Sequence, residues 1–278
     1  MAREIGIVAG LWRYPVKSML GEQVAELEIT PAGAVGDRAW ALREMATRRI
    51  VSAKKFPAMY DFRAAYDEPP KPGTFASVAI RLPDGRIIHA QDENASDQIS
   101  AALGRKVRLE RCEAVGRERA GIDPATVFAD VPVENVIQGL TRETMPPEFG
   151  LAPGTFFDSA PIHLLASGTL QHMAKLAPGS IFDPRRFRAN ILVDTGLGAC
   201  GFVEDEWEGA TIAVGESVRI VKARAALRCV MTTHPQDDLP RDYAVLRTAA
   251  RHHRANVGVF AQIGAAGTVR LGDIVRIE

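Results

Sequence analysis

Residues 211–233 read TIAVGESVRIVKARAALRCVMTT, and this stretch decides the fold class of the second half of the chain. Two runs rich in valine and isoleucine, Thr211–Val214 and Val218–Val221, have the composition and length of short strands. A third apolar run, Cys229–Thr232, follows them and predicts another strand. The second half is therefore predicted to be rich in strands.

Further elements are predicted on both sides of this stretch. Short apolar runs predict strands over Ile191–Val193, Val257–Ile263 and Ile274–Ile277. Apolar residues at helical spacing predict one helix over His163–Leu176 and another over Tyr243–His253, whose arginines face outward. The pattern of the second half indicates a β-barrel with helices packed on it.

The first half has the pattern of short strands separated by turn residues. Such strands are predicted over Ile5–Val16, Val24–Ile29, Ala39–Arg43, Met59–Ala65 and Val78–Leu82. Asp84 and Gly85 predict a hairpin turn, because this pair accepts the positive φ values of a tight turn. Ser96 is predicted to cap a helix that Gly104 ends. This spacing indicates a barrel or a sandwich.

The whole chain is therefore predicted to be a strand-rich α/β protein of the α+β kind, built from two different modules. At 278 residues it has room for one large or two ordinary domains. We place an N-terminal β-barrel-like module at residues 1–112 and a second module at residues 113–278. The proline-rich stretch Met145–Gly154 is predicted to be an exposed connection.

The composition restricts the classes of function. Lys+Arg and Asp+Glu both total 34, so no global field favours nucleic acid or an anionic membrane. No run of about 18 apolar residues is present, and Arg13 interrupts the apolar start. We expect a cytoplasmic protein that binds neither nucleic acid nor membrane, and in the absence of coiled-coil heptads we expect a monomer.

Sequence motifs for disulfide frameworks, zinc sites and dinucleotide sites are either absent or weak. Cys112, Cys200 and Cys229 are too far apart for a disulfide framework or a CxxC site, and the six histidines contain no HExxH. Gly196, Gly198 and Gly201 fit GxGxxG, but the acidic stretch that follows is too short for the helix of a dinucleotide site. We interpret it as a glycine-rich loop.

Cys229 is the strongest candidate for a reactive or metal-binding residue. Arg228 precedes it, and a neighbouring guanidinium favours the thiolate, which is the form that binds a soft metal or attacks an electrophile. A buried inert thiol is the alternative.

Three clusters combine basic residues with turn-forming or polar partners. They are Tyr14-Pro15-Val16-Lys17-Ser18, Gly36-Asp37-Arg38 and Arg186-Phe187-Arg188-Ala189-Asn190. Lysine is a compact point charge, arginine a bidentate fork and asparagine a mixed donor and acceptor, which suits a phosphate group and the edge of a pterin. Taken singly, each cluster also fits an ordinary salt-bridged surface.

In these motifs, their order and their spacing, the chain resembles the MOSC family, in the branch that contains the amidoxime reducing components. YPVKS and GDR are similar to motifs of the family's N-terminal β-barrel module, and LLAS, RFRxN and RCxxTT to motifs of its MOSC domain. The resemblance covers nearly the whole chain. It implies a MOSC β-barrel with packed helices and a molybdenum cofactor (molybdopterin), a labile group that purified protein can lose.

The resemblance also implies roles for single residues. Cys229 would be the protein thiolate on molybdenum. The pterin and its phosphate would be held by the cofactor-binding residues Lys17, Ser18, Arg38, Ser167, Arg188, Asn190 and Arg228. Asp158 is a candidate proton donor for catalysis, with a helix cap as its alternative role.

Three functions follow from this pattern. The first is an oxidoreductase that reduces small N-hydroxylated substrates, such as amidoximes, hydroxylamines and N-hydroxylated bases. The chain lacks the ligand spacing of an iron–sulfur cluster, so a separate protein would donate the electrons. The second is a carrier of the cofactor, or of sulfur as a persulfide on Cys229. The third is a metal-free enzyme that uses Cys229 as a nucleophile on small sulfur or carbonyl compounds.

Overall fold

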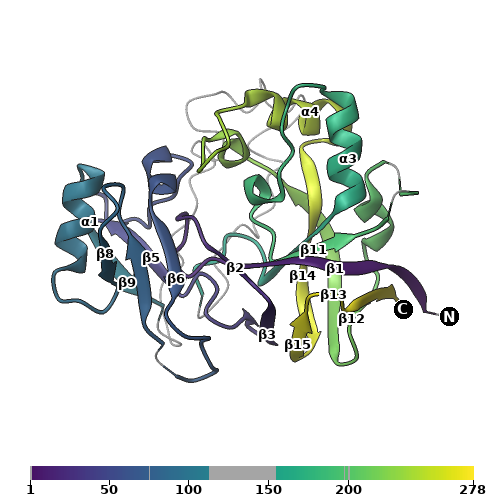
Figure 1. Cartoon of the computed structure of the whole chain (residues 1–278), viewed down its shortest axis with the longest axis horizontal. Coiled ribbons are helices and arrows are strands. Elements are labelled where there is room, and N and C mark those ends of the chain that lie inside the picture. Colours follow the sequence, from purple (N-terminus) through teal and green to yellow (C-terminus); the bar gives the residue numbers. More distant parts are fainter. Residues whose placement is uncertain (1, 75, 113–154, 197, 200) are drawn as a thin grey trace.

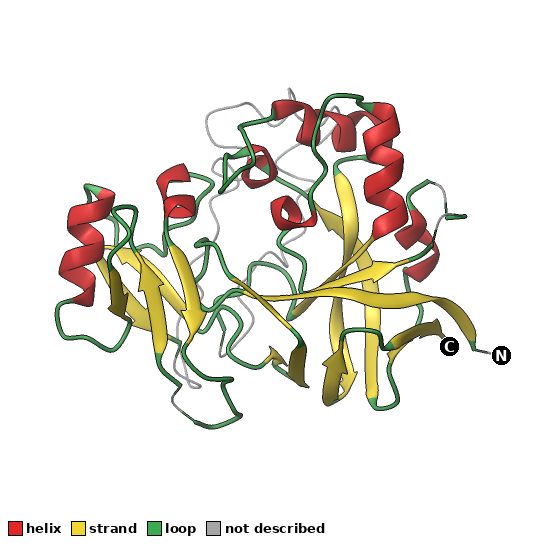
Figure 2. Cartoon of the chain, viewed as in Figure 1, coloured by secondary structure: helices red, strands yellow, loops and turns green. Residues whose placement is uncertain are grey.

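The computed structural model describes residues 2–74, 76–112, 155–196, 198–199 and 201–278 (Figure 1). It has the predicted strand-rich α+β class, with a closed β-barrel beside a second group of strands (Figure 2). The connection predicted over Met145–Gly154 lies outside the described residues, and the boundary between residues 112 and 113 stays a prediction.

Seven strands form the barrel in the order β11-β10-β14-β13-β12-β16-β1, and the pairing of β1 with β11 closes it. The strands are β1 (Arg3–Arg13), β10 (Ile162–Ala166), β11 (Ile191–Asp194), β12 (Ile212–Val214), β13 (Val218–Leu227), β14 (Asn256–Ala265) and β16 (Ile274–Ile277). Neighbours are antiparallel except β10 and β11, which run parallel because a helix joins them. β2 (Glu22–Val24) extends the sheet beyond β1.

The first strand of the chain therefore completes a barrel whose other strands all follow residue 160 (Figure 1). A β-bulge between Val8 and Gly10 interrupts the alternation of side chains, so that Val8 and Leu11, three residues apart, both lie in the barrel core. There they meet Leu164, Ile191, Val214, Ile220, Val259 and Val275, all fully buried. Each such side chain contributes about 1.5–3 kcal/mol when it leaves water.

The N-terminal group of strands has a core of its own. It contains β5 (Trp40–Glu44), β6 (Arg63–Tyr66), β7 (Val78–Arg81), β8 (Ile87–His89), β9 (Val107–Arg111), the 3-10 helix η1 (Pro57–Asp61) and helix α1 (Ala95–Leu103). β5 pairs with β9, and β6, β7 and β8 form a meander. The predicted turn at Asp84 and Gly85 joins β7 to β8, with φ of 88° at Gly85. Leu42, Met59 and Ile80 are buried between these elements.

A small sheet links the two parts of the fold. It contains β15 (Gly267–Arg270), β3 (Glu26–Thr30) and β4 (Gly33–Ala34). Leu27 and Ile29 of β3 and Val269 of β15 belong to the core of the barrel. This sheet therefore ties the N-terminal part of the chain to the barrel a second time.

Two helices cover one end of the barrel (Figure 2). α3 (Ser167–Leu176) and α4 (Tyr243–His253) share a third core with the 3-10 helix η3 (Pro184–Phe187), through Met173, Phe187 and Val245. Asp242 caps α4 by accepting a hydrogen bond from the backbone of Ala244 at 2.8 Å.

Three predicted elements are wrong in type or extent. The first four residues of the run His163–Leu176 lie in β10, and helix α3 begins at Ser167. The run Met59–Ala65 contains the end of η1 before β6 begins. Helix α1 has Asn94 at its N-cap, while Ser96 accepts a hydrogen bond from the backbone of Leu109. Gly104 ends that helix with φ of 67°, as predicted.

The strand predicted over Cys229–Thr232 is also wrong. Cys229 is extended, and the 3-10 helix η5 (Val230–Thr233) begins directly after it. Thr232 and Thr233 donate their hydroxyl hydrogens to the carbonyls of Cys229 and Val230, three residues earlier. These bonds satisfy the backbone locally and favour a turn over a strand.

The glycine-rich segment contains no α-helix in the part that the structure describes. After Gly201 the chain forms η4 (Val203–Trp207), a 3-10 helix of five residues. This agrees with its interpretation as a loop; Leu197 and Cys200 lie outside the described residues.

Among the residues that the structure describes, no helix is both long enough and apolar enough to cross a membrane.

The closure of the barrel by β1 predicts a stability difference between two leucines. Leu11 is fully buried in the barrel, so Leu11→Ala should lower the free energy of unfolding by about 2–5 kcal/mol. Leu271 is 46% exposed, and Leu271→Ala should change it by about 0.5 kcal/mol or less. Unfolding in guanidinium chloride measures both. An equal loss of unfolding free energy in the two variants would contradict the role of β1 in the core.

Candidate functional site

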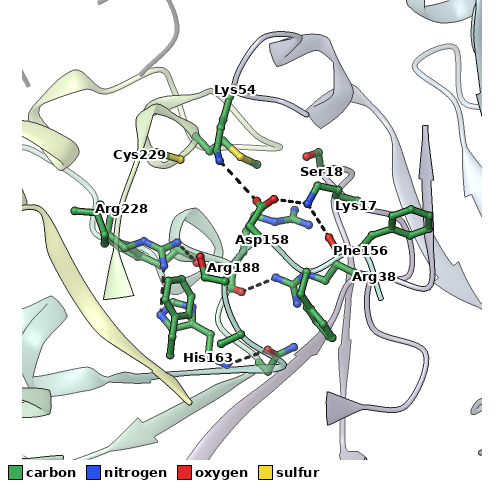
Figure 3. A pocket seen from close by; sticks show the side chains of 18 of the residues that line it. Lys17, Ser18, Arg38, Lys54, Phe156, Asp158, His163, Arg188, Arg228 and Cys229 are labelled. Atoms are coloured by element: carbon green, nitrogen blue, oxygen red, sulfur yellow. Dashed lines mark hydrogen bonds and ion pairs between the residues drawn. The ribbon is translucent and has the colours of Figure 1, made fainter. Parts of the chain in front are cut away.

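A pocket of about 120 Å³ lies where loops of the N-terminal part meet the loop before β11 and the end of β13 (Figure 3). Six of its lining residues are basic: Lys17, Lys54, Arg38, Arg186, Arg188 and Arg228. The other polar groups come from Ser18, Asp158, Ser159, His163, Asn190 and Cys229. The apolar wall is made by Phe156, Phe157, Ala160, Phe187, Leu227, Met231 and Phe260.

Backbone hydrogen bonds hold two loops of the N-terminal part together at the pocket. Arg38 donates its backbone N–H to the carbonyl of Tyr14 at 2.7 Å, and Trp40 donates to the carbonyl of Pro15 at 3.0 Å. Lys17 in turn donates to the carbonyl of Trp40 at 2.8 Å. These bonds place the side chains of Lys17 and Arg38 on the same wall of the pocket.

Three residues of the pocket have a left-handed backbone conformation that side chains disfavour. They are Ser18 with φ of 67°, Arg38 with φ of 48° and Arg188 with φ of 55°. Such a conformation costs about 1–3 kcal/mol for a residue other than glycine. Residues held in this way are concentrated at functional sites, so their presence supports a functional role for the pocket.

Asp158 lies between two lysines (Figure 3). Its carboxylate pairs with the ammonium of Lys17, and its other oxygen lies 3.7 Å from Nζ of Lys54. Lys17 also donates to the carbonyl of Phe156 at 2.7 Å. Burial alone would raise the pKa of Asp158, but Lys17 and Lys54 hold this pKa well below its ordinary value. Asp158 is therefore ionised at neutral pH.

The pKa values of the two lysines are shifted in opposite directions. Burial lowers the pKa of Lys17, because the attraction of Asp158 offsets only part of the desolvation. Burial also acts to lower the pKa of Lys54, but Asp158 and Cys229 together outweigh it, and the pKa is raised. Lys54 is thus a firmly charged cation beside the cysteine.

Asp37 joins the N-terminal loops to the barrel. Its carboxylate accepts hydrogen bonds from the backbone of Tyr14 at 2.7 Å and from Nδ2 of Asn190 at 3.0 Å, and it pairs with Arg38. Asn190 also accepts a hydrogen bond from the backbone of His163 at 3.2 Å. This buried network fixes the loop before β11 against the chain that follows β1.

Two arginines keep donor groups without a partner among the described residues. Arg188 donates to the carbonyl of Met19 at 2.6 Å and stacks over the ring of Tyr14 at 4.1 Å, but its Nη2 has no hydrogen-bond partner. Arg228 donates to the carbonyl of Phe187, while its buried Nε has no partner. Burial lowers the pKa of Arg228 to about 10, so it stays charged at neutral pH.

His163 and Arg186 support the site from the barrel side. Burial, and then the charge of Arg228, lower the pKa of His163 well below its ordinary value, so its imidazole is neutral. Its Nε2 lies 3.5 Å from Nη1 of Arg228. The guanidinium of Arg186 is satisfied by four backbone carbonyls, those of Ile181, Thr232, His234 and Pro240. Arg186 therefore has a structural role.

Cys229 is a free thiol at the N-cap of η5 and lines the pocket. In the described part of the chain, no group of three His, Cys, Asp or Glu residues could hold a metal ion. A metal at this pocket would therefore take one sulfur from the protein and its further ligands from a cofactor.

The charges of the pocket fit an anionic cofactor. Five cations, those of Lys17, Arg38, Lys54, Arg188 and Arg228, line the pocket together with one carboxylate, that of Asp158. The buried carboxylate of Asp37 pairs with Arg38 but does not line the pocket. Buried cations with open donors favour a ligand that carries negative charge and several acceptor oxygens. A phosphorylated cofactor with a sulfur-binding metal satisfies the cations, the open donors and Cys229 together.

The structure brings most of the sequence-predicted residues together. Those that line the pocket are Lys17, Ser18, Arg38, Asp158, Arg188, Asn190, Arg228 and Cys229. Ser167 is not among the lining residues: it donates to Asp194 at 2.8 Å and accepts from the backbone of Thr195. The helix-cap role considered for Asp158 is wrong, because its segment precedes β10 and the next helix begins at Ser167.

Sequence reasoning missed Lys54 and His163. Lys54 stands beside Lys55 in a loop, and nothing in the sequence distinguishes one from the other. His163 was included in a predicted helix, whereas on β10 its ring lies against Arg228 and Phe260. The apolar neighbours of His163 signal burial but not its contact with the pocket.

The fold agrees with the comparison to known proteins. The model of the MOSC N-terminal beta barrel domain matches residues 5–121, and the model of the MOSC domain matches residues 152–276. The chain belongs to the MOSC family.

Curated relatives are similar over nearly the whole chain. The human protein named mitochondrial amidoxime reducing component 2 is 24% identical over 304 residues, which cover 98% of this chain and 84% of that protein. The mouse mitochondrial amidoxime-reducing component 1 is 24% identical over 310 residues, with coverage of 98% and 82%. Among solved structures, the YuaD protein of Bacillus subtilis has 12% identity and a TM-score of 0.48, covering 100% of this chain and 98% of that one.

The Asp37 network predicts a large effect of one asparagine. Asn190→Ala would leave the backbone N–H of His163 without its partner and would remove one of the two donors to Oδ2 of Asp37, which keeps Arg38. We expect the free energy of unfolding to fall by about 1–3 kcal/mol. Asn94→Ala loses only the exposed partner Gln98, because the side chain of this N-cap residue makes no capping hydrogen bond, and the free energy of unfolding should change by about 0.5 kcal/mol or less. Chemical unfolding compares the two; equal losses would argue against the network.

Proposed function

We propose that this protein is a molybdenum-cofactor-dependent oxidoreductase that reduces small N-hydroxylated substrates, such as amidoximes to amidines and hydroxylamines to amines. The observation that carries the proposal is the placement of the Cys229 thiol in a pocket with an excess of buried positive charge. The names of the relatives, amidoxime reducing components, support the choice of substrate class.

Different side chains of the pocket would hold different parts of such a cofactor. Cys229 offers the protein sulfur for the metal. Arg188 and Arg228 offer open donors to anionic or carbonyl oxygens, and Lys17 and Arg38 add charge on the opposite wall. Ser18 and Asn190 provide shorter polar groups that suit the edge of a pterin.

The cofactor, when bound, supplies a metal centre that exchanges electrons and oxygen, which the side chains of this chain cannot do. The reduction of an N-hydroxyl group consumes two electrons and two protons and releases water. We propose that the electrons come from a separate protein, because the sequence has no iron–sulfur ligand spacing.

The protons have to come from the pocket or from solvent. Asp158 stays a proposed donor, and this role requires that its ion pairs with Lys17 and Lys54 open first. In the paired state the carboxylate instead holds the two ammonium groups in place.

The proposal predicts that reduction of benzamidoxime depends on Cys229. Protein loaded with cofactor in a molybdate-fed host and supplied with a chemical reductant should convert benzamidoxime to benzamidine. Cys229→Ser should lower this rate by more than about 100-fold, because outer partners of a metal already cost roughly 10–100-fold. Chromatography of the amidine measures the rate.

Cys112→Ser is the matched control, because Cys112 does not line the pocket, and its rate should equal that of the unaltered protein. Loaded protein that leaves benzamidoxime untouched would contradict the proposed reaction. Turnover by metal-free protein would instead support a nucleophilic role for Cys229, and a persulfide on Cys229 without turnover would support a carrier.

A further inference from the structure

Helix α4 and the residues at its two ends present a basic surface to solvent. Its exposed side chains recur at the spacing of one side of a helix, and they are Tyr243, Arg247, Arg251 and Arg254, preceded in the chain by Arg241. The buried residues of the helix lie on its opposite side, and they are Val245, Leu246, Thr248 and Ala249. The five exposed residues are called the basic face of α4.

The four arginines of the basic face have no carboxylate partner in the part of the chain that the structure describes. Arg241 instead donates to the hydroxyl of Tyr243 at 3.4 Å. The carboxylates around α4 have other partners, since Asp242 caps the helix and Asp205 contacts His253. In a chain with equal numbers of acidic and basic residues, the basic face is therefore a local excess of positive charge.

Stabilisation of the helix explains only part of this charge. Arg251 lies in the last turn, where a cation interacts favourably with the negative end of the helix dipole. Arg247 lies in the middle of the helix, and Arg241 precedes its N-terminus, where a cation is unfavourable. Arginine and tyrosine are also the residue types that are enriched in the contact surfaces between proteins. The basic face thus has the composition of a protein interface.

The basic face lies close to the segment that carries Cys229. α4 packs on η5, which begins directly after Cys229, and Asp242 donates its backbone N–H to the carbonyl of Thr233 at 2.9 Å. Figure 1 shows α4 at the top edge of the molecule. An α-helix is about 10–12 Å in diameter, so a partner docked on the exposed side of α4 would lie within about that distance of the side that contacts η5.

We propose that the basic face of α4 docks the acidic surface of the protein that donates electrons to the cofactor at Cys229. The partner is the separate electron donor of the proposed function, so this inference rests on that function. Its chemistry is that of a small redox protein whose surface carboxylates meet the four arginines.

Electron-transfer complexes suit a surface of this kind. They bury less than about 1,200 Å² in total, so a partner needs only a small area for docking. Charge complementarity speeds association and orients the two proteins without a large apolar contact. Each encounter would deliver one electron, so two reduced donor molecules are oxidised for every N-hydroxyl group that is reduced.

The test measures the binding of flavodoxin, a small acidic flavoprotein, to the full chain from a molybdate-fed host. Isothermal titration compares the unaltered protein with Arg247→Glu/Arg251→Glu at ionic strengths of about 10 mM and about 150 mM. We expect the double variant to raise Kd by at least about tenfold at the lower ionic strength, and by less at the higher one, because salt screens exposed charges. Arg247→Gln/Arg251→Gln removes the charges without reversing them and should raise Kd by a smaller factor.

Lys71→Glu/Arg81→Glu is the matched control, because it changes the net charge equally at exposed residues in the N-terminal group of strands. It should bind flavodoxin as the unaltered protein does. An unchanged Kd in Arg247→Glu/Arg251→Glu, or an equal increase in the control, would overturn the docking surface. Single-stranded RNA and vesicles that contain phosphatidylserine are titrated in parallel, and tighter binding of either would overturn an acidic protein as the partner.

Steady-state kinetics separates docking from chemistry. With reduced flavodoxin as the electron source, Arg247→Glu/Arg251→Glu should raise KM for flavodoxin and leave the rate with a small chemical reductant unchanged. A loss of rate with both reductants would overturn the role of the face in electron delivery. So would flavodoxin that delivers no electrons to protein that is active with the chemical reductant. Binding that depends on the arginines can occur in protein that leaves benzamidoxime untouched, so failure of the reaction and failure of the docking surface are separate results.

Discussion

The pairing of β1 with β11 and β16 is the contact on which both the barrel and the site depend. It closes a barrel whose other six strands all follow residue 160, and it buries Val8 and Leu11 in that core. The chain that leaves β1 carries Lys17 and Ser18 directly to the loop that holds Arg188 and Asn190. This pairing brings together residues that lie more than 150 positions apart in the sequence. The site is thus a consequence of how the barrel closes.

Electrostatics explains why the meeting point is suited to an anionic ligand. Burial makes isolated cations costly, and the protein offsets this cost with Asp37, Asp158, backbone carbonyls and the rings of Tyr14 and Phe260. The compensation is incomplete, because Arg188 and Arg228 keep donors without partners among the described residues. The left-handed backbone at Ser18, Arg38 and Arg188 adds strain at the same place. The unpartnered donors are consistent with a pocket that binds an anionic ligand.

Much of this arrangement could be predicted from the sequence, for identifiable reasons. Strand runs such as Val218–Val221 have a clear pattern, and Cys229 is conspicuous beside Arg228. The strand predicted over Cys229–Thr232 is absent, because two threonine hydroxyls stabilise a turn that the pattern of apolar residues does not reveal. Lys54 was missed, because its role arises from its distance to Asp158 and not from any motif. Asp158 was singled out in the sequence, but its ion pairs with two lysines could not be, because these lie more than 100 residues away in the sequence.

The central claim is that Cys229 holds a molybdenum cofactor, and the most direct measurement is the molybdenum content of the purified protein. Protein from a cofactor-competent, molybdate-fed host is compared by elemental mass spectrometry with Cys229→Ser and Cys112→Ser from the same host. We predict nearly one molybdenum per chain in the unaltered protein and in Cys112→Ser, and a loss of the metal in Cys229→Ser. The same low molybdenum content in all three proteins, or full retention in Cys229→Ser, would contradict the claim.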